Sequence, residues 1–176
     1  EAGPLARGLG RRALLVRGAS ARAALRVEPL QHGLESSGVS WVTCTVRGEP
    51  QVEDARGAVL RARAEACDLV VACGGGAALD LGKAVAALMT NPGDALDYLE
   101  VVGAGRALER PSLPVLAIPT TSGTGSEATR NAVLGSPAHR VKASLRSPWI
   151  LPRVALVDPE LTLDLPAELT ASTGMD

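Results

Sequence analysis

Short apolar runs alternate along most of the chain with longer stretches in which apolar residues recur at helical spacing. The first run covers 12–17 and ends at Gly18, after which Ser20 can cap a helix over 20–37. This order predicts a strand, a turn and a helix. We therefore expect a fold in which strands and helices alternate.

The same unit then repeats. A strand is predicted over 40–46, followed by a helix over 52–66 whose apolar residues share one face. The run over 68–73 is apolar without alternation, which is typical of a parallel strand covered on both faces. It leads into three glycines, a helix over 77–90 and a short helical turn over 95–99.

The rhythm changes toward the end of the chain. After a strand over 114–118, the segments 129–135 and 139–146 predict the two strands of a β-hairpin, and 154–157 predicts another short strand before a tail of short helices. The whole pattern predicts an α/β fold with an open, mainly parallel, Rossmann-like sheet, flanking helices and a β-hairpin near the C-terminal end. In such sheets, ligands bind beyond the carboxyl ends of the strands.

Composition excludes several classes of protein. The chain has 176 residues, of which 46% are hydrophobic and 21% charged, with a net charge of −1, so it is expected to be globular and not to bind nucleic acid. Aromatic residues make up only 2%, so base stacking cannot be a main binding mode. No stretch has the ~18 apolar residues of a membrane span, and no signal peptide opens the chain, which favours a cytoplasmic location without a membrane partner.

Histidine and cysteine chemistry is sparse. His32 and His139 are far apart in sequence, so this chain cannot assemble a multi-histidine metal site by itself, and His139 is interpreted as a surface residue of the hairpin. The three cysteines lack a C-x-x-C spacing, which favours buried free thiols over a disulfide framework or a zinc site. No residue stands out as a general acid or base.

A first turn, residues 74–77, joins the third predicted strand to a helix with three consecutive glycines. Backbone N–H groups without blocking side chains at the positive end of a helix form a phosphate cradle. The alternative is a tight turn in which glycine supplies positive φ angles. Gly82 and Lys83 do not belong to a P-loop, because alanines replace the glycine and the hydroxyl residue that this motif requires.

Asp80 lies in the first turn of that helix and has two possible roles. It can complement the helix dipole and pair with Lys83 three residues later, or it can contact a cofactor. A second turn, residues 120–127, is rich in hydroxyl groups and glycine, which suits hydrogen bonding to a ribose or a nicotinamide amide. The glycine fingerprint that begins at Gly123 is only formal, because no acidic residue follows about twenty positions later.

Four segments together resemble the motifs of the iron-containing (group III) alcohol dehydrogenase family. They are Gly-Gly-Gly-x-x-x-Asp-x-x-Lys at 74–83, Pro-Thr-Thr-Ser-Gly-Thr-Gly-Ser-Glu-x-Thr at 119–129, Val-Asp-Pro-Glu-Leu-Thr at 157–162, and Thr-Gly-Met-Asp at 173–176. The resemblance implies that the chain, over 1–176, is the N-terminal dinucleotide-binding domain of such an enzyme. The all-helical metal domain of the family is then absent from this chain.

The resemblance also implies cofactor contacts. Ala77 departs from the usual serine, which removes a hydroxyl donor to phosphate and leaves the backbone cradle intact. Lys142, which taken alone would be a solvated edge lysine, aligns with a cofactor-contacting lysine of the family. The candidate cofactor-binding residues are Gly18, Gly74, Gly75, Gly76, Ala77, Asp80, Thr120, Thr121, Thr124, Thr129 and Lys142.

Gly18 bears on the choice of cofactor. Family members that use NAD usually carry an aspartate at this position, which accepts hydrogen bonds from the adenosine ribose. Without that carboxylate a 2′-phosphate is not repelled, and Arg17 or Arg22 could pair with it. We therefore predict NADP as the preferred cofactor, with NAD as the alternative.

The resemblance assigns one metal ligand to this chain, Asp176, with histidines farther along holding the same divalent iron or zinc ion. A single carboxylate cannot hold a catalytic metal, so the chain alone is expected to bind cofactor without dehydrogenase activity. The sequence begins with Glu1 instead of methionine and stops at Asp176, so it is expected to be a piece of a longer enzyme.

The predicted function is therefore hydride transfer between NAD(P) and a small alcohol, aldehyde or ketone in a metal-dependent dehydrogenase. Family resemblance implies a homo-oligomer, such as a dimer. Two alternatives remain open: a dehydroquinate synthase-like lyase, which the Thr-Gly-Met-Asp segment disfavours, and a non-catalytic nucleotide-binding module.

Overall fold

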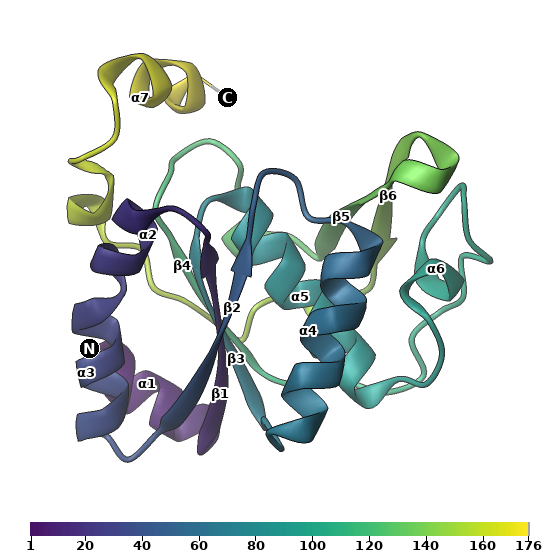
Figure 1. Cartoon of the computed structure of the whole chain (residues 1–176), viewed down its shortest axis with the longest axis horizontal. Helices are drawn as coiled ribbons and strands as arrows, with labels where there is room; N and C mark the ends of the chain where they lie inside the picture. Colours follow the sequence, from purple (N-terminus) through teal and green to yellow (C-terminus); the bar gives the residue numbers. More distant parts are fainter. Residues whose placement is uncertain (176) are drawn as a thin grey trace.

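The computed structural model describes residues 1–175 as a five-stranded parallel sheet with helices on both faces and a separate two-stranded hairpin (Figure 1). The strand order is β2-β1-β3-β4-β7. This confirms the predicted α/β fold with a mainly parallel sheet. The strands of the sheet are β1 (Arg12–Gly18), β2 (Ser40–Val46), β3 (Leu69–Gly74), β4 (Val115–Pro119) and β7 (Val154–Ala155).

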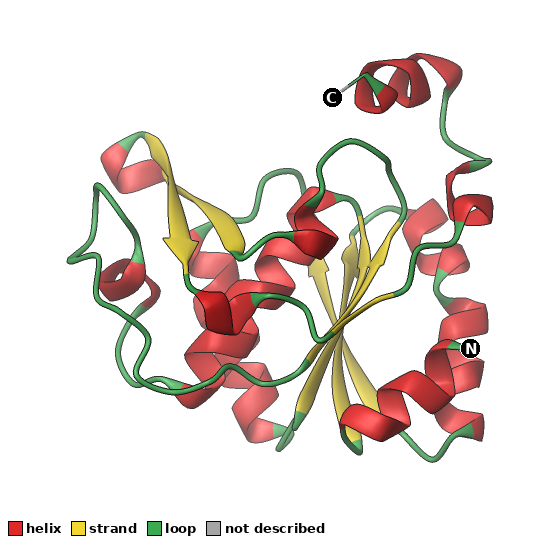
Figure 2. Ribbon diagram, turned by 180° about the vertical axis from the view of Figure 1, so that it is seen from behind, coloured by secondary structure: helices red, strands yellow, loops and turns green. Residues whose placement is uncertain are grey.

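Two helical layers sandwich the sheet (Figures 1 and 2). Leu14 and Val16 of β1 pack toward α4 and α5, whereas Ala13 and Leu15 pack toward α1 and α3. Because both faces are covered, the strand is apolar at consecutive positions instead of alternating. The helices are α4 (Val52–Ala64) and α5 (Gly76–Thr90) on one face, and α1 (Ala2–Leu9), α2 (Ala21–Arg26) and α3 (Glu28–Ser36) on the other.

The predicted helix over 20–37 is wrong, because the chain forms two helices there. Val27 ends α2, and Pro29 stands in the first turn of α3. Proline has no N–H to donate to the preceding turn, so it starts a new helix instead of continuing the old one. The helix α1 had no clear sequence signal; it forms where Gly3 packs so closely on α3 that a Cβ there would lie 2.1 Å from the Gly33 carbonyl oxygen.

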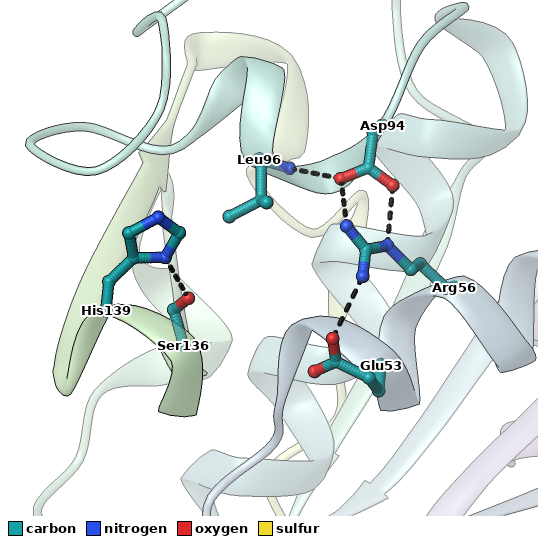
Figure 3. A network of polar contacts seen from close by, with 6 residues as sticks. All are labelled: Glu53, Arg56, Asp94, Leu96, Ser136 and His139. Carbon is teal, nitrogen blue, oxygen red and sulfur yellow. Dashed lines mark hydrogen bonds and ion pairs between the residues drawn. The ribbon is translucent and has the colours of Figure 1, made fainter.

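The hairpin, β5 (Asn131–Ser136) and β6 (Val141–Arg146), confirms the predicted antiparallel pair, with each strand starting two residues later than expected. Ala132 and Leu134 are buried in the core shared with α5, whereas Asn131 and Val133, which alternate with them, are only half-buried. His139, at the tip, is exposed and its Nδ1 lies 2.7 Å from Ser136 Oγ (Figure 3).

The short helix α6 (Ala95–Tyr98) is anchored to α4 by an ion pair (Figure 3). Arg56 donates two hydrogen bonds to Asp94, with Nε–Oδ2 at 2.6 Å and Nη2–Oδ1 at 2.7 Å. This contact holds the pKa of Asp94 below its ordinary value. The same carboxylate caps α6 at Leu96 N, so one side chain both starts the helix and fixes it to its neighbour.

The tail forms a 3₁₀ turn (Pro159–Thr162) and then α7 (Ala167–Gly174), which confirms the predicted short helices. None of the helices within residues 1–175 has both the length and the apolar character needed to cross a membrane. The cysteines are free thiols, with Cys67 and Cys73 buried and Cys44 half-buried, as expected. Burial raises the pKa of the Cys73 thiol to about 11.

Candidate functional site

Both glycine-containing turns lie where the strands end. The first turn follows β3 and the second follows β4, and these two strands are parallel neighbours in which Gly74 is paired with Pro119. The backbone N–H of Thr120 donates to the Gly74 carbonyl at 3.0 Å, so the turns leave the sheet side by side. Loops at the carboxyl ends of a parallel sheet are where such folds bind ligands.

The first turn contains glycines because neighbouring atoms leave little room for side chains. None of Gly74, Gly75 and Gly76 has a positive φ, so the alternative of a turn that uses glycine for its backbone conformation is wrong. A Cβ on Gly74 would lie 2.7 Å from Ala78 Cβ, and one on Gly76 would lie 3.2 Å from Thr124 Cγ2. Gly74 therefore leaves room for Ala78 of α5, and Gly76 permits close approach of the second turn.

The amino end of α5 is open to a ligand. Gly75 precedes the helix and provides no side-chain cap for its first N–H groups. Such groups are unpaired within a helix and carry its positive partial charge. The first turn therefore has the geometry of an anion cradle.

The second turn uses its glycines differently. Gly123 has φ +92° and Gly125 has φ +59°, in the left-handed region that favours glycine. Thr121 and Thr124 face the first turn, since their side chains are the atoms nearest to Cβ positions built on Gly75 and Gly76. The turn thus presents hydroxyl groups beside the open end of α5.

Asp80 connects α5 to the second turn and to the hairpin. Its Oδ1 accepts from Ser126 Oγ at 2.5 Å and lies 3.0 Å from Lys83 Nζ, and its Oδ2 accepts from Val133 N at 3.1 Å. The predicted pairing with Lys83 is confirmed. Burial lowers the pKa of the Lys83 ammonium from its ordinary value, and the charge of Asp80 opposes this effect.

A cavity of about 490 Å³ lies between the amino end of α5 and the outward face of the hairpin. The predicted residues that line it are Gly76, Ala77, Asp80, Thr124, Thr129 and Lys142. Gly74, Gly75, Thr120 and Thr121 support this wall from the two turns without lining the cavity. Residues of three separate segments thereby meet around one space.

Four cavity-lining residues were missed by sequence reasoning: Glu49, Ser126, Asn131 and Val133. Glu49 Oε1 lies 3.2 Å from Lys142 Nζ, and both side chains are more than half exposed. The Oδ1 atom of Asn131 is buried and has no hydrogen-bond partner among the described residues. Strand alternation could have indicated Asn131, since its neighbour Ala132 faces the core, but nothing local indicated Glu49.

Gly18 lies in a separate cavity of about 460 Å³ at the ends of β1 and β2, together with Ser20 and Arg47. The two arginines predicted for this place are turned to backbone groups. Arg17 donates to the Gly18 carbonyl at 2.9 Å, and Arg22 donates to the Asp164 carbonyl at 2.8 Å. Arg47 is exposed and lines the cavity, because parallel pairing puts the end of β2 beside Gly18.

The model of one family, described as iron-containing alcohol dehydrogenase, matches residues 1–159 of this sequence. The chain belongs to the iron-containing alcohol dehydrogenase family. The family resemblance is thereby confirmed, and the match covers the first two of its four motifs in full.

Among curated relatives of this dehydrogenase family, long-chain-alcohol dehydrogenase 1 of Geobacillus thermodenitrificans is 45% identical over 128 residues, which are 73% of this chain and 32% of the relative. The solved structure of a 1,3-propanediol oxidoreductase matches with a TM-score of 0.91 at 35% identity, covering 99% of this chain and 45% of that one. Sulfoacetaldehyde reductase from Bifidobacterium kashiwanohense, solved in complex with NAD⁺, matches with a TM-score of 0.84 at 34% identity, covering 98% and 44%. The chain thus spans less than half the length of these family members.

The predicted metal site of this chain rests on Asp176. Asp176 lies outside the described residues. In the part of the chain that the structure describes, no three His, Cys, Asp or Glu side chains gather as metal ligands would. The arrangement of the described residues therefore argues only for a cofactor site.

Proposed function

We propose that residues 1–176 form the nicotinamide dinucleotide-binding domain of an iron-containing alcohol dehydrogenase that interconverts small alcohols and their aldehydes or ketones. The observation that carries the proposal is the meeting of the open end of α5 with the hydroxyl-rich second turn around one cavity. Because the matching family is one of dehydrogenases, the lyase and the non-catalytic alternatives are not proposed.

The residues around the cavity fit a dinucleotide. The first turn would hold the pyrophosphate on the N–H groups of Gly76 and Ala77, where the dipole of α5 favours negative charge. Lys142 adds a positive charge at the opposite wall. The buried Oδ1 of Asn131 lacks a donor, which an amide or hydroxyl of the ligand could provide after a small side-chain rotation.

The bound dinucleotide supplies the chemistry, since its nicotinamide ring gives or takes the hydride. This chain's residues bind and orient it. The cradle and Lys142 set the position of the phosphates, and Thr124 presents a hydroxyl group on the path from the phosphates to the hairpin. Thr129 lines the same wall, with its hydroxyl bonded to Lys83 and to the Ser126 carbonyl. No side chain of this cavity is assigned a proton-transfer role.

The finer parts of the proposal rest on family resemblance. A divalent iron or zinc ion would be held by Asp176 together with residues from the rest of the enzyme. The complete enzyme is proposed to be a cytoplasmic homo-oligomer, such as a dimer. Its substrates are proposed to be small alcohols and carbonyl compounds.

NADP is the proposed cofactor, because the cavity at Gly18 contains Arg47 and no carboxylate among its lining residues. Titration calorimetry of the full chain should show NADPH binding at least about tenfold more tightly than NADH, the effect of one charge-assisted contact to phosphate. Arg47→Met should reduce this preference to within about twofold. Arg153→Met, which changes an exposed arginine at the opposite end of the sheet, is the matched control.

Tighter binding of NADH than of NADPH by the wild-type chain would overturn the NADP preference and leave the domain assignment intact. Failure to bind either dinucleotide would overturn the domain assignment itself. An Arg47→Met variant that keeps the full preference would show that another residue recognises the 2′-phosphate.

Glu49→Gln is expected to strengthen dinucleotide binding about twofold to fivefold. Glu49 pairs with Lys142 in the absence of ligand, so a phosphate must compete with its carboxylate for the same ammonium. The gain is modest because an exposed ion pair contributes at most about 1 kcal/mol. The dissociation constant measured by calorimetry at low and high salt checks both the direction and its electrostatic origin.

A double-mutant cycle isolates this competition. In a Lys142→Met background, Glu49→Gln should leave the dissociation constant unchanged, because the contested cation has been removed. Glu100→Gln is the matched control, since Glu100 forms a comparable exposed pair with Arg146 away from the cavity. Weaker binding by Glu49→Gln alone would contradict the prediction and make the carboxylate a ligand contact.

A further inference from the structure

Lys83 is a buried cation that the proposed cofactor contacts do not use. Its side chain is fully buried, and the residue lies in α5 about two helical turns after Gly76. Its Nζ lies 3.0 Å from Asp80 Oδ1, 2.8 Å from the Ser126 carbonyl oxygen and 3.2 Å from Thr129 Oγ1. The three donors of the ammonium therefore each have an acceptor.

Two of these acceptors belong to the end of the second turn and to the residues just after it, and not to α5. Asp80, on the same helix, adds a bond from Ser126 Oγ and one from the backbone N–H of Val133 in β5. The segment 80–83 of α5 is thus hydrogen-bonded both to the second turn (residues 120–127) and to β5, the first strand of the hairpin. These are the two walls that face the cradle across the cavity.

We propose that Lys83 and Asp80 are positioning residues that set the distance between the cradle and the second turn, so that one dinucleotide can span both. The inference rests on the proposed function. A buried ammonium cannot exchange its acceptors for water, so loss of any of them leaves a desolvated charge. The turn carrying Ser126 is therefore held at one distance from α5, even though its exposed part is a glycine-containing loop.

If the ion pair between Asp80 and Lys83 had a purely structural role, its removal would have a different effect on binding. If the pair only stabilised the fold, its removal would weaken all nucleotides equally or none of them. If it sets the span of the site, removal should weaken a ligand that reaches from the first turn to the second, and spare a ligand that occupies only the first. ADP and NADH are two ligands that allow this comparison, because NADH contains the nicotinamide riboside and ADP lacks it.

The test compares binding of ADP and of NADH to the full wild-type chain and to the Asp80→Asn/Lys83→Met double variant. The double variant removes both charges together, which avoids leaving either one buried without its partner. Calorimetry should show NADH weakened at least about tenfold and ADP changed by less than about twofold. Ser126→Ala, which deletes one bond from the turn to Asp80 and keeps the ion pair, should weaken NADH about threefold and spare ADP.

Arg63→Met provides the matched control. Arg63 donates to the Leu88 carbonyl at 2.8 Å and so binds the far end of the same helix, away from the cavity. It should lower the thermal midpoint without changing the ratio of NADH to ADP affinity. If the double variant does not fold, Ser126→Ala decides the question alone.

The outcomes separate the two proposals. A wild-type chain that binds ADP and fails to bind NADH or NADPH contradicts the proposed function. A wild-type chain that binds NADH, with variants that keep its affinity ratio to ADP, contradicts the positioning role alone. Parallel weakening of both ligands in the double variant and in Ser126→Ala also contradicts it, because this is the behaviour of a structural pair.

Discussion

Gly76→Val is expected to weaken dinucleotide binding at least about a hundredfold while the chain stays folded. A Cβ on Gly76 would lie 3.2 Å from Thr124 Cγ2, and the branched methyl groups of valine would extend over the open end of α5. The phosphate and these methyl groups cannot occupy the same space. Gly76 has no positive φ, so valine causes no backbone strain, and the exposed Thr124 side chain needs to move by only a few tenths of an ångström. The loss should therefore fall on binding.

Calorimetry with NADPH, together with far-UV circular dichroism to show that the fold is kept, measures the effect of Gly76→Val. Gly57→Val is the matched control, because Gly57 lies within α4 and a Cβ there would meet no atom within 4 Å. The control should bind as the wild type does. Binding by Gly76→Val within about threefold of wild type would mean that the pyrophosphate does not lie on this turn.

Gly82→Val is expected to lower the free energy of unfolding by about 3 kcal/mol, the upper end of the cost of overpacking a core. A Cβ on Gly82 would lie 2.8 Å from Ala72 Cβ and 3.3 Å from Val70 Cγ1, so α5 could not stay at its present distance from β3. Gly82 thus belongs to the packing of the helix on the sheet and not to a phosphate-binding motif.

Urea unfolding followed by circular dichroism gives this change directly. The same Gly57→Val chain serves as the control and should lose less than about 0.5 kcal/mol. Ala72→Gly introduced into Gly82→Val should recover part of the loss, since it removes the nearest clashing atom. A Gly82→Val chain as stable as the control would show that helix and strand can separate at no cost.

Local patterns were enough to predict most of the elements. Every residue of β3 is buried because helices cover both faces of the sheet, and the first four residues of β5 alternate between half-buried and buried because only one face of that strand packs on α5. The prediction failed over 20–37, where Pro29 divides two helices, and at α1. The helix α1 depends on contact with α3, which no window of residues around it contains.

The residues of the candidate site, like the elements of the fold, could be predicted only in part from local sequence. Its glycine and threonine residues are adjacent in sequence, so the two turns could be predicted as candidate ligand-binding segments from local motifs alone. Glu49 and Arg47 follow a different strand and carry no local signal of their own. They reach their cavities only because β2 is placed at the edge of the sheet beside β1.

The sequence by itself determined the alternation of strands and helices after the first strand, the two candidate ligand-binding turns and the family, because periodicity, glycine position and motif spacing are properties of neighbouring residues. The tertiary structure decided why the glycines of the first turn are needed, since their φ angles are ordinary and it is the close approach of Ala78, Thr121 and Thr124 that leaves little room for a side chain. It also decided the role of Lys83, because the bonds that satisfy its charge join residues 83, 126 and 129, which are brought together only when β4 pairs with β3 and the hairpin packs on α5.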